Sequence, residues 1–257
     1  MSRVQSFKKM HQQGNMLHIG NVWDVQSALL FEHKGYKALG TSSAAIADTL
    51  GYDDGEQIPF DELFRIVQAI MKVISIPLSV DIEAGYSRDE QCIIEHIIRL
   101  SDIGVVGVNI EDSIVDSHNH RHLVDSSHFS QTIKAIKQGL ARSGVDLFLN
   151  VRTDGFILGL DNPLDETLAR AMLYEESGAD GLFAPCIVAQ QDIQQLVASL
   201  SIPVNVMAMP QLPDFLTLEV LGVRRVSAGS FIYQKIKKQC EQSIACLEKD
   251  QSFHALF

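Results

Sequence analysis

The chain has 257 residues, of which 46% are hydrophobic and 21% are charged, so it can bury a sizeable core. Its formal net charge of −11 argues against nucleic acid and anionic membranes as partners, because both attract basic surfaces. No apolar run reaches the roughly 18 residues that a membrane helix needs. The N-terminus has no apolar signal segment and the 4 cysteines form no CxxC pair, which favours a reduced, cytoplasmic setting.

Short apolar runs rich in β-formers alternate with longer amphipathic stretches along the whole chain. Near-continuous apolar strands are typical of a parallel sheet that is covered on both faces. The runs span residues 16–23, 37–43, 76–83, 105–112, 145–154, 179–185, 202–208 and 223–229. Helical patterns lie between them, as in "PFDELFRIVQAIMKVI" and "PLDETLARAMLYEESG". Repeated strand–helix units in 257 residues predict a (β/α)8 TIM-type barrel, which typically takes ~250 residues; a doubly wound open sheet is the alternative.

The domain organisation follows from the absence of an internal linker. No stretch rich in proline, glycine or serine divides the sequence, so we expect a single domain over residues 1–257. A helical extension begins at about residue 231, in "FIYQKIKKQCEQSIACLEKD". Its apolar side chains follow helical spacing and predict a buried stripe of Ile232, Ile236, Cys240, Ile244 and Leu247. The stripe would pack on its own barrel or on that of a second copy.

Charged residues stand at the ends of several predicted strands. Asp81 and Glu83 close the third run, Glu111 closes the fourth, and Arg152 and Asp154 close the fifth. In a barrel these ends converge on one mouth, which is the face that carries the active site. Like charges cluster at low dielectric only with a counter-cation or with raised pKa values, and oxygen ligands suit Mg²⁺ or Mn²⁺. The pattern therefore predicts a hard divalent cation at the mouth.

Other polar and aromatic residues near the predicted strand ends allow more than one interpretation. Trp23 follows the first run and either walls a pocket or fills the end of the barrel. Asn205 lies in the seventh run and is a further candidate for substrate contact. A single acid at a strand end is usually a helix cap or a solvated loop residue, an interpretation that covers Asp24, Asp61 and Asp154. If every acid belonged to that class, the barrel would be structural only.

The motifs, taken in order, resemble the isocitrate lyase/phosphoenolpyruvate mutase superfamily, and most of all its short phosphonomutase-like branch. They extend from about residue 21 to residue 230 and include "NVWDVQSA", "GTSSAAIADTLGYDDGE", "SVDIEAGYS", "GVNIEDS", "NVRTDGFILG" and "GADGLFAP". The resemblance implies a modified (β/α)8 barrel that binds Mg²⁺ and a small 2-oxo or 2-hydroxy acid. It also implies an enolate-like species in C–C or P–C bond chemistry, and a homodimer or homotetramer that can exchange its last helix.

The resemblance, together with the strand-end pattern, assigns roles to individual residues. The metal ligands would be Asp81, Glu83, Glu111 and Asp54. The catalytic residues would be Arg152, Glu111 and Asp54. The substrate-binding residues would be Trp23, Ser42, Ser43, Asp81, Arg152 and Asn205. Glu83 departs from the family pattern, which has the shorter Asp at the second position of the acidic pair.

The segment after the fourth strand departs further from the family pattern. The lyases carry a Lys-Lys-Cys-Gly-His loop there, whereas this chain reads "DSIVDSHNHRHLVDSSH", without Cys or Lys. Cleavage of isocitrate by the usual route is therefore not expected. Asn119 lies in the region of the mutases' asparagine-bearing loop. The alternating His118, His120 and His122 either bind zinc or belong to a mobile lid in which one histidine acts as general acid or base.

These expectations converge on a Mg²⁺-dependent enzyme for a small 2-oxo or 2-hydroxy carboxylate. C–C cleavage of the oxaloacetate type, by decarboxylation, hydrolysis or lyase action, fits a lid that lacks cysteine, because loss of CO₂ needs no general base. Phosphonopyruvate or phosphoenolpyruvate mutase chemistry at a P–C bond is one alternative. A binding protein for 2-oxo acids without catalysis is another.

Overall fold

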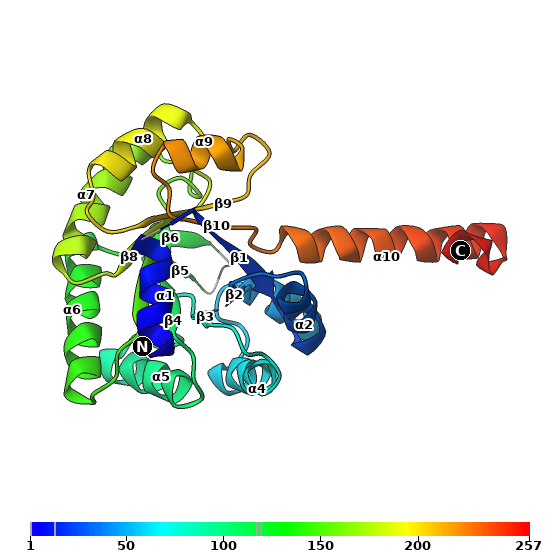
Figure 1. The fold of residues 1–257 in the computed structure, drawn as a ribbon, viewed down its shortest axis with the longest axis horizontal. Helices are drawn as coiled ribbons and strands as arrows, with labels where there is room; N and C mark the ends of the chain where they lie inside the picture. The colour runs from blue at the N-terminus through cyan, green and yellow to red at the C-terminus, as the bar shows by residue number, and fades with distance from the viewer. Residues whose placement is uncertain (1, 13, 117, 119) are drawn as a thin grey trace.

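Parallel strands form a closed eight-stranded barrel in the computed structural model, which describes residues 2–12, 14–116, 118 and 120–257 (Figure 1). Around the barrel the order is β1, β2, β3, β4, β7, β8, β9 and β10, and β10 closes on β1. The barrel strands are β1 (Leu17–Val22), β2 (Ala38–Thr41), β3 (Leu78–Asp81), β4 (Gly107–Glu111), β7 (Phe148–Arg152), β8 (Gly181–Ala184), β9 (Val204–Met207) and β10 (Arg225–Ser227). The predicted (β/α)8 barrel is confirmed, and closure excludes the open sheet.

Most helices follow a strand and cover the outside of the barrel, whereas α1 precedes β1 and α10 extends away from the barrel. They are α1 (Arg3–Gln12), α2 (Val25–His33), α3 (Ser43–Leu50), α4 (Phe60–Met71), α5 (Glu90–Asp102), α6 (Ser126–Arg142), α7 (Pro163–Glu176), α8 (Gln190–Ala198), α9 (Phe215–Val220), α10 (Phe231–Asp250) and the short η1 (Phe253–Leu256). Local sequence explains their starts. Asp24 caps α2 by accepting a 2.7 Å hydrogen bond from the backbone N–H of Ser27, as its cap interpretation predicts. Pro163 opens α7 at a position that needs no hydrogen-bond donor.

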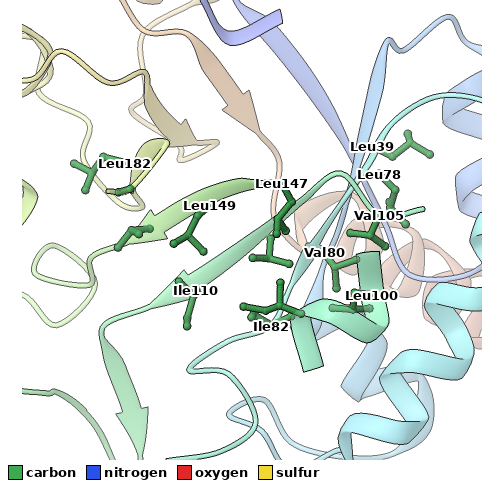
Figure 2. Close-up of a cluster of buried hydrophobic side chains, with 14 of the residues drawn as sticks. Leu39, Leu78, Val80, Ile82, Leu100, Val105, Ile110, Leu147, Leu149 and Leu182 are labelled. Carbon is green, nitrogen blue, oxygen red and sulfur yellow. The ribbon is translucent and has the colours of Figure 1, made fainter. Parts of the chain in front are cut away.

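The hydrophobic core lies between the barrel wall and the helices. Side chains alternate along each strand, so Leu78 and Val80 of β3 face outward while Ser79 and Asp81 face the barrel interior. Figure 2 shows the outward set, in which Leu100 of α5 packs near the strand leucines and valines. Each fully buried aliphatic side chain of this kind contributes roughly 1.5–3 kcal/mol. The wall is therefore stabilised mainly from outside, and the interior carries polar residues together with a smaller apolar cluster near α1.

Helix α1 closes the barrel at the N-terminal ends of the strands. Its two buried residues, Phe7 and His11, contact Phe148, the first residue of β7. The His11 ring stacks on Phe148 with centroids 4.1 Å apart, and its Nδ1 donates to the Phe7 carbonyl at 2.9 Å. A carbonyl can only accept, so neutral His11 carries its proton on Nδ1. The sequence did not predict this helix.

Helix α10 projects away from the barrel (Figure 1). None of its described residues is buried, and Ile236 and Ile244 are 45% and 54% exposed. The expected stripe is therefore helical but not buried within one chain. Within the residues that the structure describes, no helix has both the length and the apolar character needed to cross a membrane.

Candidate active site

A polar cavity opens at the C-terminal ends of the barrel strands, where barrel enzymes place their chemistry. Its volume is about 170 Å³, which suits a small molecule rather than a nucleotide. Residues from every side of the barrel line it, among them Asn21, Ser42, Ser43, Asp54, Asp81, Asn109, Arg152, Phe183, Ser227 and Arg225. The structure thus brings most of the predicted site residues to one place.

Asp81 reaches this cavity from the last position of β3. Its Oδ2 accepts a 2.9 Å hydrogen bond from Ser43 Oγ, and its backbone N–H donates to Thr41 Oγ1 at 2.8 Å. Ser43 is the first residue of α3, and Ser42 caps that helix, so free N–H groups of the first turn also face this region. Burial raises the pKa of the Asp81 carboxyl, while Arg152 and Ser43 oppose the shift. The Asp81 carboxyl therefore lines the cavity, and Arg152 and Ser43 offset part of the cost of burying its charge.

Glu83 lies behind Asp81 and is almost fully buried. Tyr86 donates to its Oε1 at 3.0 Å, and the backbone N–H of Glu56 donates to its Oε2 at 2.7 Å. The backbone of Glu83 is left-handed, with φ of 48°, which turns the chain sharply after the strand. Burial raises the pKa of Glu83 well above its usual range, and Asp54 and Glu111 add to the rise. The sequence did not reveal Tyr86 or Glu56 as partners.

Glu111 and Arg152 form a buried ion pair beside Asp81. The Nη1 atom of Arg152 lies 2.7 Å from Glu111 Oε2, although the pair lacks hydrogen-bond alignment at that oxygen. Arg152 also donates to both carboxylate oxygens of Asp154, at 2.6 Å and 2.9 Å. Burial raises the pKa of the Glu111 carboxyl, and the Arg152 guanidinium opposes that shift. The guanidinium is thus fixed in orientation where β7 meets the cavity.

Asp154 is inaccessible to solvent, which corrects the expectation of a cap or a solvated loop residue. It accepts hydrogen bonds from Arg152 and, at 2.6 Å, from Ser113 Oγ. It caps no helix, because the N-cap of α7 is Asn162. Asp154 is buried because the buried guanidinium of Arg152 is stable only when a carboxylate pairs with it. Asp154 is therefore a positioning residue for Arg152.

The segment after β4 folds into an antiparallel hairpin of β5 (Ser113–Val115) and β6 (Arg121–Leu123). Arg121 extends from β6 into the acidic cluster, where its Nη1 donates to Glu111 Oε1 and, at 2.7 Å, to Ser113 Oγ. Its Nη2 lies 3.4 Å from Asp54 Oδ2. Arg121 was not predicted as a site residue, because only the pairing of β6 with β5 brings it back to the acidic cluster.

Zinc binding by this hairpin finds no support. The backbone N–H groups of His118 and His120 donate to Asp116, and His122 is exposed. Across the described parts of the chain, no three His, Cys, Asp or Glu side chains are grouped to hold a metal ion. Asn119, the candidate for a mutase-like contact, lies outside the described residues.

Asp112 follows Glu111 but has a structural role. It is inaccessible to solvent, and its Oδ2 accepts from Tyr174 at 2.8 Å and from Arg170 at 3.2 Å. Thr153 donates to the same oxygen at 2.9 Å. This network joins β4 to α7 and faces away from the cavity. Burial raises the pKa of Asp112, and Tyr174 and Arg170 oppose the rise.

Two predicted substrate contacts do not line the cavity. The Trp23 ring packs against Tyr233 of α10, with centroids 5.2 Å apart, and faces an apolar groove between α2 and α10. Asn205 is 1% exposed and lies inside the barrel beside Arg225, its partner in the strand register. Neither amide atom of Asn205 has a hydrogen-bond partner among the described residues.

Comparison with known proteins supplies the family. The sequence matches the profile of the phosphoenolpyruvate phosphomutase family over residues 7–247. It is 33% identical over 228 residues to the uncharacterised Mycobacterium tuberculosis protein Rv1998c, covering 89% of this chain and 83% of that one. It is 28% identical over 236 residues to an oxaloacetate decarboxylase of Pseudomonas entomophila, covering 89% and 78%.

A solved structure is also similar over nearly its whole length. It comes from Burkholderia cenocepacia J2315 and is provisionally named a phosphonomutase. The identity is 34%, the coverage is 95% of this chain and 99% of that one, and the TM-score is 0.87. The resemblance inferred from the motifs is thereby confirmed. The chain belongs to the phosphoenolpyruvate phosphomutase family and is an enzyme of the isocitrate lyase/phosphoenolpyruvate mutase superfamily.

Proposed function

We propose that this enzyme cleaves a C–C bond in a small 2-oxo carboxylate, in a Mg²⁺-dependent reaction such as decarboxylation of an oxaloacetate-like acid. One observation carries the proposal: Asp81, Arg152 and Ser43 line one small polar cavity at the barrel mouth. The carboxylate can bind a cation, and the guanidinium and the helix N-terminus can each bind an anionic oxygen. These three groups together complement a 2-oxo acid that chelates a metal ion. The oxaloacetate decarboxylase relative supports this chemistry.

The donor set fits a Mg²⁺ ion held by few direct protein ligands. Mg²⁺ commonly keeps several waters and is bound through one or two carboxylates. Asp81 is the candidate for direct contact, and Asp54 also lines the cavity. Glu83 and Glu111 would hold waters of the ion; burial raises the pKa of both carboxyls, and the nearby acids add to the rise, which supports a cation at this place. When bound, the ion would supply a Lewis acid for the negative charge of an enolate.

The protein's own groups then have defined tasks. Arg152, fixed by Asp154, would bind the substrate carboxylate, and the N-terminus of α3 at Ser42 and Ser43 would bind another anionic oxygen. Loss of CO₂ leaves an enolate that only needs to gain a proton, so the absence of a lid cysteine is no obstacle. Arg121 covers the hairpin side of the acidic cluster, where it pairs with Glu111 and Asp154.

The test is proton NMR of oxaloacetate, 2-oxoglutarate, phosphonopyruvate and 2-methylisocitrate with the protein, with and without Mg²⁺. We expect Mg²⁺-dependent loss of oxaloacetate beyond the no-protein control, with pyruvate as product. Conversion of phosphonopyruvate instead would favour P–C bond chemistry, which the provisional phosphonomutase makes the second candidate. Line broadening without conversion of any compound would favour the binding protein.

We also propose a homo-oligomer, a dimer or tetramer, in which α10 packs on another copy. The helix carries exposed apolar side chains, including Ile236 and Ile244. An apolar groove of about 680 Å³ between α2 and the start of α10 includes Trp23 and Leu30. Exposed apolar surface of this kind marks an interaction site. Light scattering at micromolar concentration should give a multiple of 28.5 kDa, and a monomer would refute the proposal.

A further inference from the structure

The interior of the barrel beneath the cavity carries a group of buried polar residues above an apolar layer of Ile19, Ala38 and Phe148, which packs with Phe7 of α1. The inward positions of β3, β4, β7, β9 and β10 carry Ser79, Asn109, Asn150, Asn205 and Arg225, whereas the outward positions belong to the hydrophobic core. All five are nearly inaccessible to solvent. Interior positions of small barrels are usually filled by bulky branched side chains, so this composition calls for a ligand or water to satisfy it.

Arg225 is the charged member of this set, and its hydrogen bonds are incomplete. It is 2% exposed, and its Nη2 donates to Asn109 Oδ1 at 3.2 Å. Its Nε and Nη1 have no partner among the described residues, and neither have Ser79 Oγ or the Asn205 amide next to it. No carboxylate of the described residues forms an ion pair with it. A buried charge without a partner is strongly unfavourable, so something else must complete it.

The contrast with Arg152 indicates what is missing. Arg152 is compensated by Asp154 and Glu111, so the protein supplies its counter-charges. Arg225 has none, yet it lines the same cavity as Arg152, Asp81 and Asn109. Burial lowers the pKa of Arg225 to about 9, with Asp81 opposing the shift, so the guanidinium is still protonated at neutral pH. The cavity therefore has a compensated cation near its rim and an uncompensated one at its floor.

We propose that Arg225 binds a second anionic group of the substrate and thereby selects dianionic acids over monoanionic ones. The inference rests on the proposed function, because it assumes that the first carboxylate lies near Asp81 and Arg152. The distal group would accept hydrogen bonds from Arg225 Nε and Nη1, and the Asn205 amide lies in register to assist. A distal carboxylate and a distal phosphonate share this chemistry.

The test uses stable 2-hydroxy acids that differ at one end. (S)-Malate and (S)-2-hydroxybutanoate have the same chain, with a distal carboxylate in one and a methyl group in the other. Calorimetry in Mg²⁺ buffer should show malate binding to the wild-type protein about 10- to 100-fold more tightly, since a charge-assisted hydrogen bond has that strength. 2-Hydroxy-3-phosphonopropanoate, measured in the same way, shows whether carboxylate or phosphonate is the preferred distal group.

The decisive variant is Arg225→Met, and Arg224→Met is its matched control at the exposed residue that directly precedes β10. We expect Arg225→Met to bring malate affinity down to that of 2-hydroxybutanoate and to leave 2-hydroxybutanoate affinity unchanged. Arg224→Met should keep the preference. The proposal would be overturned if Arg225→Met lowered the affinities for both ligands equally, or if it kept the preference for malate. Arg225 would then be a structural arginine or one that buried water satisfies.

The wild-type comparison stands even if Arg225→Met does not fold, because equal affinities of the wild-type protein for the two acids also overturn the proposal. A failure of the proposed function gives a different result. The NMR assay would then detect no turnover of 2-oxo acids, while calorimetry would still show the preference for malate and its loss in Arg225→Met.

Discussion

Arg152 and Asp154, two residues apart at the end of β7, are joined by parallel hydrogen bonds of 2.6 Å and 2.9 Å. Such a bidentate pair fixes the plane of the guanidinium as well as its position. The third nitrogen of the guanidinium, Nη1, lies 2.7 Å from Glu111 Oε2. The arginine that we assign to substrate binding is therefore oriented before any substrate arrives.

Replacement of Arg152 by Lys should lower kcat/KM for oxaloacetate by about 100-fold, because a lysine cannot keep both bonds to Asp154 and its charge would be misplaced. The measurement is steady-state kinetics under the conditions in which NMR detects turnover. Arg142→Lys, at the exposed end of α6, is the control and should be neutral. Wild-type activity in Arg152→Lys would contradict the assignment.

Asp81→Asn should weaken Mg²⁺ binding by about 100-fold, because it removes the negative charge of the carboxylate that we propose as the direct metal contact in the cavity. Titration calorimetry with Mg²⁺ alone measures the loss without any need for turnover. The exposed Asp61, which pairs with Arg99, provides Asp61→Asn as the control. Unchanged affinity in Asp81→Asn would remove the basis for the metal site.

Arg121→Gln should destabilise the metal-free protein by about 3 kcal/mol, because Glu111 and Asp154 lose a cation that lies among them. For a chain of this size the melting temperature would fall by roughly 6–10 °C. Mg²⁺ should restore part of the loss, since the ion supplies positive charge to the same acids. Melting curves in EDTA and in Mg²⁺ measure both effects. Arg88→Gln, which breaks the more exposed pair with Glu56, should respond equally in both buffers.

Stability should fall as pH drops below 6.5, with His11 responsible for part of the slope. Burial, together with the charge of Arg225, lowers the pKa of His11 to about 3 in the folded protein. The unfolded chain binds the proton near pH 6.5 and the folded chain does not, so protonation favours unfolding between these values. The contribution is about 2 kcal/mol between pH 7 and pH 5. Urea unfolding of His11→Gln should show a shallower pH slope, and the exposed His33→Gln should keep that of the wild type.

The barrel could be predicted from the sequence because each of its strands is a short apolar run buried against helices. The extent of the strands was less predictable: the run at 145–154 became Phe148–Arg152, since its acidic end turns back to bind Arg152. Helix α1 escaped prediction because only Phe7 and His11 of its residues are buried. An amphipathic pattern needs more apolar positions than these two.

The acidic residues of the candidate site could be predicted from the sequence, but the residues that bind them could not. Asp81 and Glu111 stand at the ends of predicted strands, and this position alone predicts that they lie at the mouth of the barrel. Arg121 and Tyr86 reach the cluster through a hairpin and a left-handed turn, and no spacing rule predicts such contacts. Arg225 was not among the predicted site residues, because no sequence pattern distinguishes it from the adjacent Arg224 until strand alternation turns its side chain inward.

The separation between an aliphatic outer layer and a polar interior has a consequence for how this enzyme can be altered. Substitutions at Ser79, Asn150 or Asn205 touch no part of the packing between strands and helices. If the proposal for Arg225 holds, ligand preference and most of the packing against the helices depend on different faces of the same strands. A library confined to the inward positions should yield mostly folded variants with new selectivities, which makes the lumen a natural target for directed evolution.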